Sequence, residues 1–516
     1  MNYSPGKLSF IFMLAVLLSV IGAAWVASRY RAAMRRLMSA PLAAAPPASR
    51  EAEPAPIDWP DPMPVSAAGN RRAGRRLVML LVALSALISL TSAAVQLHVV
   101  MGEKTLSINR LALLAFVQLW PVIPSLGLLW RWSRWRVLGA LVLWFGLCFA
   151  LLVWRSVGNQ PLALLGYLAF EIGPPMALAA AVCMGGATRA VAPWLLLPML
   201  GLMWASQTGL DLIALMIPRP PGWFLALTGW LGAHAVMVLF VLLPWLLAWW
   251  PLKRLGRALA RAYARKWLSE LMVLFTTMWG ISLLAKALMA ASTMGLGGAV
   301  MLLPLAWVPV AMSLARRRPR PDRPPTLLVL RVFQHDERIQ ALFDHVVERW
   351  RLTGNTVLIA GTDLLERTMD AGDIFTFIDG RLAERFIHRP ADVAPRLAAF
   401  DLAPDAEGRY RINECYCHDT TWRQALDALV RRSDVALMDL RSFKARNEGC
   451  RHELGVLARA AHMARVVVLT DGDTELAAAR AATEGAPAGR FLWLDTARID
   501  RAKRREVLRS LFPDKN

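Results

Sequence analysis

The sequence predicts two structures in one chain: an α-helical bundle that crosses a membrane several times, followed by an α/β domain with a doubly wound parallel sheet. Composition is the first reason, because 56% of the 516 residues are hydrophobic and only 19% are charged, whereas about a quarter of an ordinary soluble chain is charged. Charge distribution is the second reason. Residues 326–516 hold 29 basic and 29 acidic side chains, so the formal charge of +21 belongs to the first 325 residues. The third reason is that short apolar runs alternate with amphipathic stretches beyond residue 326.

Nine apolar segments in the first 315 residues have about the length that a spanning helix needs, roughly 20 residues. They are 8–28, 77–100, 111–130, 137–154, 161–186, 192–217, 222–250, 268–292 and 295–315. The first is too long for a cleavable signal peptide, and arginines follow it directly, so we expect it to remain as an anchor. The predicted organisation is listed here in chain order: an anchor helix (1–37), a Pro- and Ala-rich disordered linker (38–76), an eight-helix bundle (77–315), a basic linker (316–325) and the α/β domain (326–516).

The positions of the basic residues predict the orientation in the membrane. If the connection after the first helix lies inside, the inside connections hold 24 Lys and Arg residues and the outside connections hold five. Because basic loops stay on the cytoplasmic side, we expect a bacterial inner-membrane protein with a periplasmic N-terminus and a cytoplasmic α/β domain. The expected partner of the basic region is therefore the lipid bilayer and not a nucleic acid.

Charged side chains inside predicted spans are costly, which makes them candidates for function. Glu171 lies near the middle of its span, before Pro174 and Pro175, which we expect to break the helix and leave carbonyl groups free beside the carboxylate. One interpretation is an ion or proton site, and the other is a protonated Glu171 hydrogen-bonded to a neighbouring helix. Asp211 and Lys286 each lie about six residues from the outer ends of their spans, so we expect them to form a structural ion pair.

The C-terminal region has the pattern of a parallel sheet covered by helices on both faces. The predicted strands are 327–333, 356–360, 435–440, 466–470 and 491–494, with a weaker one at 408–415. The predicted helices are 337–352, 422–432, 449–464, 474–483 and 501–511. Residues 363–407 are a poorly periodic insertion. In such a sheet the ligand crevice lies at the carboxyl ends of the strands.

The usual motifs of dinucleotide-binding folds, P-loop NTPases, zinc proteases and α/β-hydrolases are missing from the sequence. Cys415, Cys417 and His418 are spaced like metal ligands, but no second ligand pair has the spacing of a zinc site. We therefore expect buried strand cysteines, no metal and no certain cofactor.

One stretch has a more specific pattern, the run from Thr421 to Leu454. An amphipathic helix ends at Arg431-Arg432-Ser433-Asp434, an apolar strand and a polar loop follow, and a second helix opens near Cys450. This order resembles the TIR domain, and Cys450, Glu453 and Leu454 have the spacing of that family's Trp-Cys-x-x-Glu-Leu helix start. Gly449 stands where the family usually has Trp. Asn447 stands where it usually has Ser.

The resemblance implies a flavodoxin-like fold, in which Glu453 is the catalytic carboxylate that splits the nicotinamide–ribose bond of NAD. It implies nucleotide contacts by Ser442 and Cys450, and the segment Asp336-Glu337-Arg338 is a looser match to the family's acidic-Arg segment. Arg441 at the loop is a candidate to contact nucleotide phosphates, or else belongs to a solvated charged loop. For Glu453 the alternative is an acidic residue in the first turn of a helix, which the helix dipole favours without any chemistry.

Three functions remain open from the sequence. The first is a membrane-anchored TIR-like sensor or effector that binds or cleaves a nucleotide such as NAD. The second is a non-enzymatic module that self-associates or recruits partners through the α/β domain, which the Trp-to-Gly change at Gly449 favours. The third is a transporter with a regulatory cytoplasmic domain, and the missing substrate motif counts against it.

Overall fold

The computed structural model describes residues 5–39, 66–105, 107–156, 160–184, 186–318, 323–332, 337–360, 371–418 and 420–512. The chain divides into two compact units. The helical unit comprises Met1–Arg29, Leu80–Ser313 and Asp370–Gly372. The α/β unit comprises Tyr30–Met79, Leu314–Met369 and Asp373–Asn516. The last residues of the first helix and the first residues of the second therefore belong to the α/β unit.

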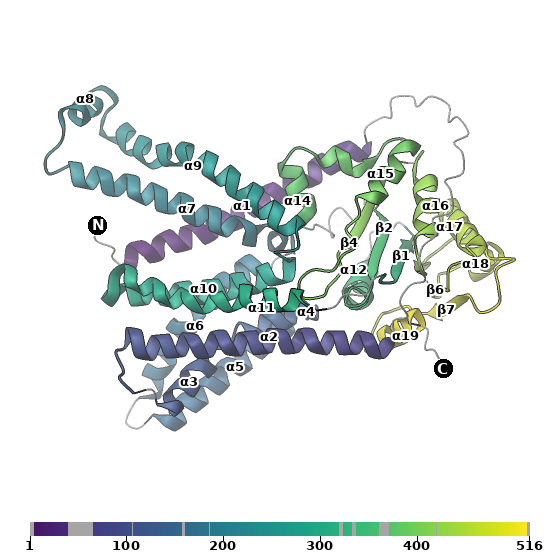
Figure 1. The fold of residues 1–516 in the computed structure, drawn as a ribbon, viewed down its shortest axis with the longest axis horizontal. Helices are drawn as coiled ribbons and strands as arrows, with labels where there is room; N and C mark the ends of the chain where they lie inside the picture. Colours follow the sequence, from purple (N-terminus) through teal and green to yellow (C-terminus); the bar gives the residue numbers. More distant parts are fainter. Residues whose placement is uncertain are drawn as a thin grey trace. The chain divides into compact units, whose positions relative to one another are not determined.

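The helical unit confirms the prediction of a polytopic membrane bundle (Figure 1). Its elements are α1 (Pro5–Ser39), α2 (Ala67–Val95), a π-helix (Gln96–Val100), α3 (Ile108–Gln118), α4 (Val122–Leu129), α5 (Arg134–Arg155), α6 (Pro161–Cys183), α7 (Gly186–Met216), α8 (Gly222–Leu231), α9 (Ala233–Ala264), α10 (Glu270–Met294), a 3-10 helix (Gly295–Ala306) and α11 (Trp307–Arg316). In the described residues, seven helices are long and apolar enough to span a membrane, or eight if the bent pair α3 and α4 is one span.

The segment Glu270–Arg316 counts as one of these seven helices, but the chain reverses direction within it. Gly295, at the end of α10, has a φ of +56°, a conformation that glycine adopts without steric cost. A Cβ on Gly298 would lie 2.7 Å from the carbonyl oxygen of Ala287, and Met301 is buried against Ala287 and Ala290. The 3-10 helix therefore folds back along α10, as the predicted segments 268–292 and 295–315 require.

Three sequence-based boundaries were wrong. The segment 222–250 is not one span, because Gly232 with a φ of +81° separates α8 from α9. Helix α9 continues to Ala264, so most of the expected connection 251–267 is helical. Helix α2 begins at Ala67 and takes up part of the predicted linker 38–76, while residues 40–65 of that linker lie outside the described residues.

The α/β unit has a sheet in which every strand pair is parallel, so the predicted fold class is confirmed. The strands of the described residues are β1 (Thr326–Arg331), β2 (Asn355–Ala360), β3 (Phe386–Ile387), β4 (Ile412–Cys417), β5 (Val435–Asp439), β6 (Arg465–Thr470) and β7 (Phe491–Asp495). Their order is β3-β4-β2-β1-β5-β6-β7. The strands β2-β1-β5-β6-β7 follow the flavodoxin-like order 2-1-3-4-5, and β4 and β3 extend the β2 edge.

Helices cover both faces of this sheet (Figure 1). The α-helices of this part of the chain are α12 (Glu337–Leu342) continued by a π turn and α13 (Glu348–Trp350), then α14 (Ala371–Ile378), α15 (Val393–Ala398), α16 (Trp422–Arg431), α17 (Glu448–Arg459), α18 (Leu476–Ala481) and α19 (Arg501–Leu511). Alternate strand residues point to opposite faces. Leu328 and Leu330 of β1 lie in the core made with α15, α16 and α17, while Trp350 stacks on Phe512 with their ring centroids 4.9 Å apart.

Strand order reverses between β1 and β5, the point at which doubly wound sheets bind ligands. From β1 the chain connects to β2 on one side, and from β5 it continues to β6 on the other. The carboxyl ends of β1 and β5 are therefore the place to look for a site.

Candidate functional site

Two charged residues lie side by side at the carboxyl ends of β1 and β5. Arg331 is the last residue of β1, and its register partner is Asp439, the last residue of β5. Both side chains are buried. Sequence reasoning did not single out either of them. The available signal was a charged residue at the end of each otherwise apolar run, LLVLR and VALMD.

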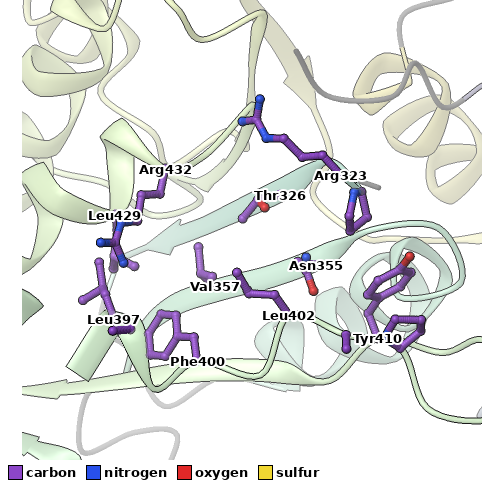
Figure 2. Close-up of a pocket in the computed structure, with 14 residues that line it drawn as sticks. Arg323, Thr326, Asn355, Val357, Leu397, Phe400, Leu402, Tyr410, Leu429 and Arg432 are labelled. Atoms are coloured by element: carbon purple, nitrogen blue, oxygen red, sulfur yellow. The ribbon is translucent and has the colours of Figure 1, made fainter. Parts of the chain in front are cut away.

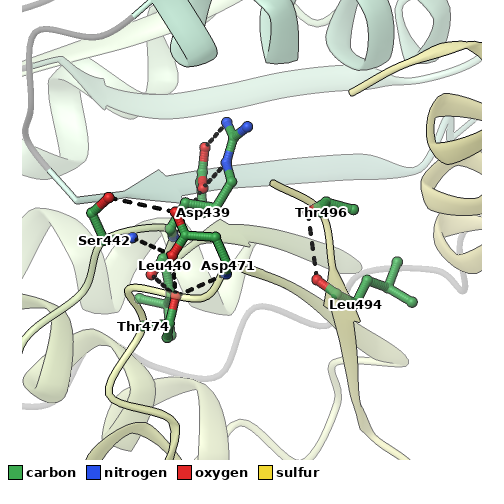
Figure 3. Close-up of polar contacts among 8 residues, drawn as sticks. Asp439, Leu440, Ser442, Asp471, Thr474, Leu494 and Thr496 are labelled. Atoms are coloured by element: carbon green, nitrogen blue, oxygen red, sulfur yellow. Dashed lines mark hydrogen bonds and ion pairs between the residues drawn. The ribbon is translucent and has the colours of Figure 1, made fainter. Parts of the chain in front are cut away.

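Arg441 is held by this acidic residue. Its Nε donates to Asp439 Oδ1 at 2.8 Å and its Nη2 donates to Asp439 Oδ2 at 2.5 Å (Figure 3). Both side chains are almost fully buried, so the Nε and Nη2 edge of the guanidinium points toward Asp439 in the protein interior. Asp439 therefore engages Nε and Nη2 of Arg441, and a contact to a phosphate, which the sequence suggested for Arg441, would have to use the remaining Nη donors of this buried side chain.

Ser442 lies in the same loop, and contacts with Asp471 hold it there. It has a φ of +61°, its backbone N–H donates to Asp471 Oδ1 at 2.9 Å, and its hydroxyl lies 3.5 Å from Asp471 Oδ2. Thr474 Oγ1 donates to the carbonyl of Leu440 at 2.9 Å. These bonds tie the loop after β5 to the loop after β6 (Figure 3).

Glu453 lies on α17, beside the carboxyl end of β1. The helix begins at Glu448, so Glu453 is in its second turn, and the expected first-turn position was wrong. Only 4% of Glu453 is exposed, and its Oε2 has no hydrogen-bond partner among the described residues. One turn earlier, Cys450 Sγ lies 4.0 Å from the carbonyl oxygen of Arg331.

The electrostatics of Glu453 follow from this burial. Loss of hydration raises the pKa of its carboxyl to about 8, against the lowering effect of the Arg331 charge. Burial also raises the pKa of the Cys450 thiol far above its ordinary value, with a smaller contribution from Glu453. Near pH 7 both groups are therefore mainly neutral, and Cys450 is not an activated thiolate.

The other expected nucleotide ligands are not placed. Asp336 and the side chain of Arg338 lie outside the described residues.

Cys415 is buried in β4, and His418 Nε2 lies 3.2 Å from His388 Nδ1. The described residues contain no group of three or more His, Cys, Asp or Glu side chains placed to hold a metal ion.

The intramembrane charges are paired differently from the sequence prediction. Lys286 of α10 forms a buried ion pair with Glu171 of α6. Asp211 instead accepts a hydrogen bond from Gln207 Nε2 at 2.9 Å and lies 3.7 Å from Lys7 Nζ. The expected Asp211–Lys286 pair was therefore wrong, because similar depth in two spans does not determine which helix faces which.

Glu171 contacts a neighbouring helix, α10, as one of the two interpretations expected, but its partner there is the Lys286 ammonium, so the contact is an ion pair and not the hydrogen bond of a protonated carboxyl. The expected helix break was wrong, since α6 runs through Pro174 and Pro175 without interruption. The two prolines still lack N–H groups, so the carbonyls four residues earlier, at Phe170 and Glu171, lose their usual helical donors.

At the switch point between β1 and β5, the Glu453 carboxyl therefore differs from the side chains that are paired with one another. Arg441 is engaged by Asp439 and Ser442 by Asp471, whereas Glu453 keeps an oxygen without a donor among the described residues. A carboxyl with a pKa near neutrality is suited to proton transfer or to stabilising a developing cation. No protein-family model, curated protein or solved structure matches this chain, and the resemblance to the TIR domain rests on its motif residues alone.

Proposed function

We propose that this integral membrane protein holds its α/β unit in the cytoplasm, at a bacterial inner membrane, and there cleaves the nicotinamide–ribose bond of NAD with Glu453. The observation that carries the proposal is the buried Glu453 carboxyl, with one oxygen lacking a partner among the described residues, beside the carboxyl end of β1. Doubly wound sheets bind nucleotides at this switch point. Most buried polar atoms in folded proteins have a hydrogen-bond partner, so one that lacks a partner calls for an explanation.

The chemistry assigns Glu453 a role as an anion. The bond between ribose C1 and the nicotinamide nitrogen breaks, the electron pair leaves with nicotinamide, and the ribosyl group becomes an oxocarbenium-like cation. Water adds to C1 and releases a proton, which gives ADP-ribose. A carboxylate beside C1 stabilises the developing positive charge.

Substrate binding prepares the ionised form of Glu453. In the free protein its pKa is about 8. The nicotinamide ring of NAD carries a positive charge, and an opposite charge close to a carboxyl lowers its pKa. Arg331 already acts in the same direction. The bound substrate therefore favours the carboxylate that the reaction needs.

The test is nicotinamide release by the full chain in lipid nanodiscs, at several protein densities to permit self-association. Glu453→Gln keeps the size of the side chain but removes the ionisable group, and we expect the rate to fall about 10²–10⁴-fold. Glu448→Gln, at the first residue of the same helix, is the matched control and retains the rate. A protein that releases no nicotinamide at any density, or a folded Glu453→Gln variant with the full rate, would refute the proposal.

The second candidate is the interaction module. It is favoured by the internal pairing of Arg441 and Ser442, the two loop residues that the sequence assigned to a nucleotide. In that case the α/β unit self-associates and Glu453 has no role in turnover. Cross-linking of the full chain that is unchanged by Glu453→Gln, together with no NAD cleavage, is the result that this candidate predicts.

A further inference from the structure

The α/β unit contains a cavity of about 490 Å³ that the proposed reaction does not use (Figure 2). It lies at the amino ends of β1 and β2, because Thr326 and Asn355, the first residues of these strands, both line it. The proposed catalytic site is at the carboxyl ends of the strands. A volume of this size is within the usual range for small-ligand pockets, about 300–1,000 Å³.

Most of the lining is apolar and comes from several elements. Val357 of β2, Leu397 of α15 and Leu429 of α16 contribute, together with Phe400 and Leu402 from the segment after α15. Figure 2 shows Val357 and Leu402 lying between Asn355 and Arg432. An occupant therefore has an apolar body.

Polar groups toward the two ends of the cavity define the rest of the occupant. Asn355 is 2% exposed, and its Oδ1 has no hydrogen-bond partner among the described residues. A buried acceptor without a partner destabilises the folded state unless a donor reaches it. A ligand hydroxyl is such a donor.

Arg432 supplies a positive charge in the lining of the cavity. Burial lowers the pKa of its guanidinium, and the neighbouring charge of Arg431 lowers it further. Arg323, the other arginine in the lining, is paired with Asp434 at 2.8 Å. Arg432 has no such acidic partner among the described residues, so its guanidinium can donate charge-assisted hydrogen bonds to an anion in the cavity.

We propose that this cavity binds a small amphiphilic anion, with its anionic head at Arg432, its aliphatic body over Leu402 and Val357, and a hydroxyl group donating to Asn355. A hydroxylated acyl carboxylate has this chemistry. The site is independent of the proposed NAD cleavage, since it shares no residue with the switch point.

The experiment uses the full chain in nanodiscs of zwitterionic lipid and a decanoate that carries a photoreactive diazirine. We expect the label on residues 397–404, and we expect 10-hydroxydecanoate to compete better than decanoate and decanol to compete poorly. Arg432→Met removes the cation but keeps an apolar side chain, and should weaken competition at least about tenfold, as for the loss of one charge-assisted contact. Arg431→Met is the matched control, because Arg431 is exposed and does not line the cavity.

Repeating the labelling with anionic lipid in the nanodisc distinguishes the source of the ligand. Reduced labelling assigns the cavity to an anionic lipid of the bilayer, and unchanged labelling assigns it to a free anion; both results fit the proposed chemistry. The proposal is overturned if the label lies elsewhere, if decanol competes as well as the acids, or if the two arginine variants behave alike. Asn355→Leu, with thermal unfolding as the folding check, should remove the advantage of 10-hydroxydecanoate over decanoate while decanoate still binds.

Discussion

At the scale of single residues, burial and not the helix dipole determines the pKa of the Glu453 carboxyl. An acid whose pKa rises from 4.5 to about 8 in the folded protein is more stable in its protonated form there. The folded state thus holds a proton that the unfolded chain has already released between these two values. The free energy of unfolding falls as the pH rises from about 4.5 to about 8, by up to about 1.4 kcal/mol per pH unit, and is level above that window.

This linkage gives a stability prediction. Glu453→Gln removes the titrating group, so the variant should gain in unfolding temperature relative to the native protein as the pH is raised from 5.5 to 8.5. Thermal unfolding of the full chain at several pH values measures the difference. A difference that does not change with pH would show that the carboxyl is hydrated and titrates at its ordinary value.

The Glu171–Lys286 pair gives a second prediction at this scale. Removing one partner of a buried ion pair leaves an uncompensated charge and costs roughly 3–5 kcal/mol, whereas removing both partners can be nearly neutral. Lys286→Met alone should lower the yield of folded protein in membranes, and Glu171→Gln with Lys286→Met should restore much of it. Asp211→Asn is the control second change, because Asp211 contacts Gln207 and Lys7. Equal rescue by Asp211→Asn would contradict the observed pairing.

At the scale of elements, the hairpin of α10 with the 3-10 helix depends on a close approach at Gly298. A Cβ there would lie 2.7 Å from both the carbonyl oxygen of Ala287 and the backbone nitrogen of Ala291, and backbone atoms in a packed helix have little room to move. Gly298→Ala should therefore lower folded yield and thermal stability.

Gly280→Ala is the matched control for the hairpin. Gly280 lies in α10, the helix against which the 3-10 helix folds back, and a Cβ there would meet nothing within 4 Å. Alanine also has the better helix propensity, by about 1 kcal/mol. Similar losses in both variants would mean that the hairpin does not close at Gly298.

The observed strands and helices also show which elements can be predicted from sequence patterns. The strands β1, β2, β5, β6 and β7 were expected within a few residues, because strands buried on both faces read as continuous apolar runs. Strand β3 was missed, since its two residues Phe386–Ile387 are too few to show a pattern. The break at Gly232 was missed because apolar residues continue on both sides of it.

The candidate site was predictable only in part, for a related reason. Glu453 and Cys450 were proposed as site residues through local spacing, and their roles stay a prediction. The Asp439–Arg441 and Ser442–Asp471 contacts depend on how loops of neighbouring strands meet, and local spacing does not contain that information. The Glu171–Lys286 pair likewise depends on which helix faces which.

At the scale of the whole molecule, the expected orientation remains a prediction from the basic residues. Reporter fusions after Arg36 and at the C-terminus should report the cytoplasm, and a fusion at Gly102, between the π-helix and α3, should report the periplasm. A C-terminus in the periplasm would remove the cytoplasmic pool of NAD from reach of the α/β unit and contradict the proposed function.

The most direct measurement of the central claim, that the Glu453 carboxylate cleaves NAD, is the pH dependence of kcat/KM for nicotinamide release by the full chain. This parameter reports ionisation in the free enzyme, where the pKa of Glu453 is about 8. The rate should therefore rise about tenfold per pH unit below pH 8 and level off above it, and the residual rate of Glu453→Gln should lack this rise. A native profile that is flat from pH 6 to 9, or a Glu453→Gln variant that follows the native profile at full rate, would contradict the claim.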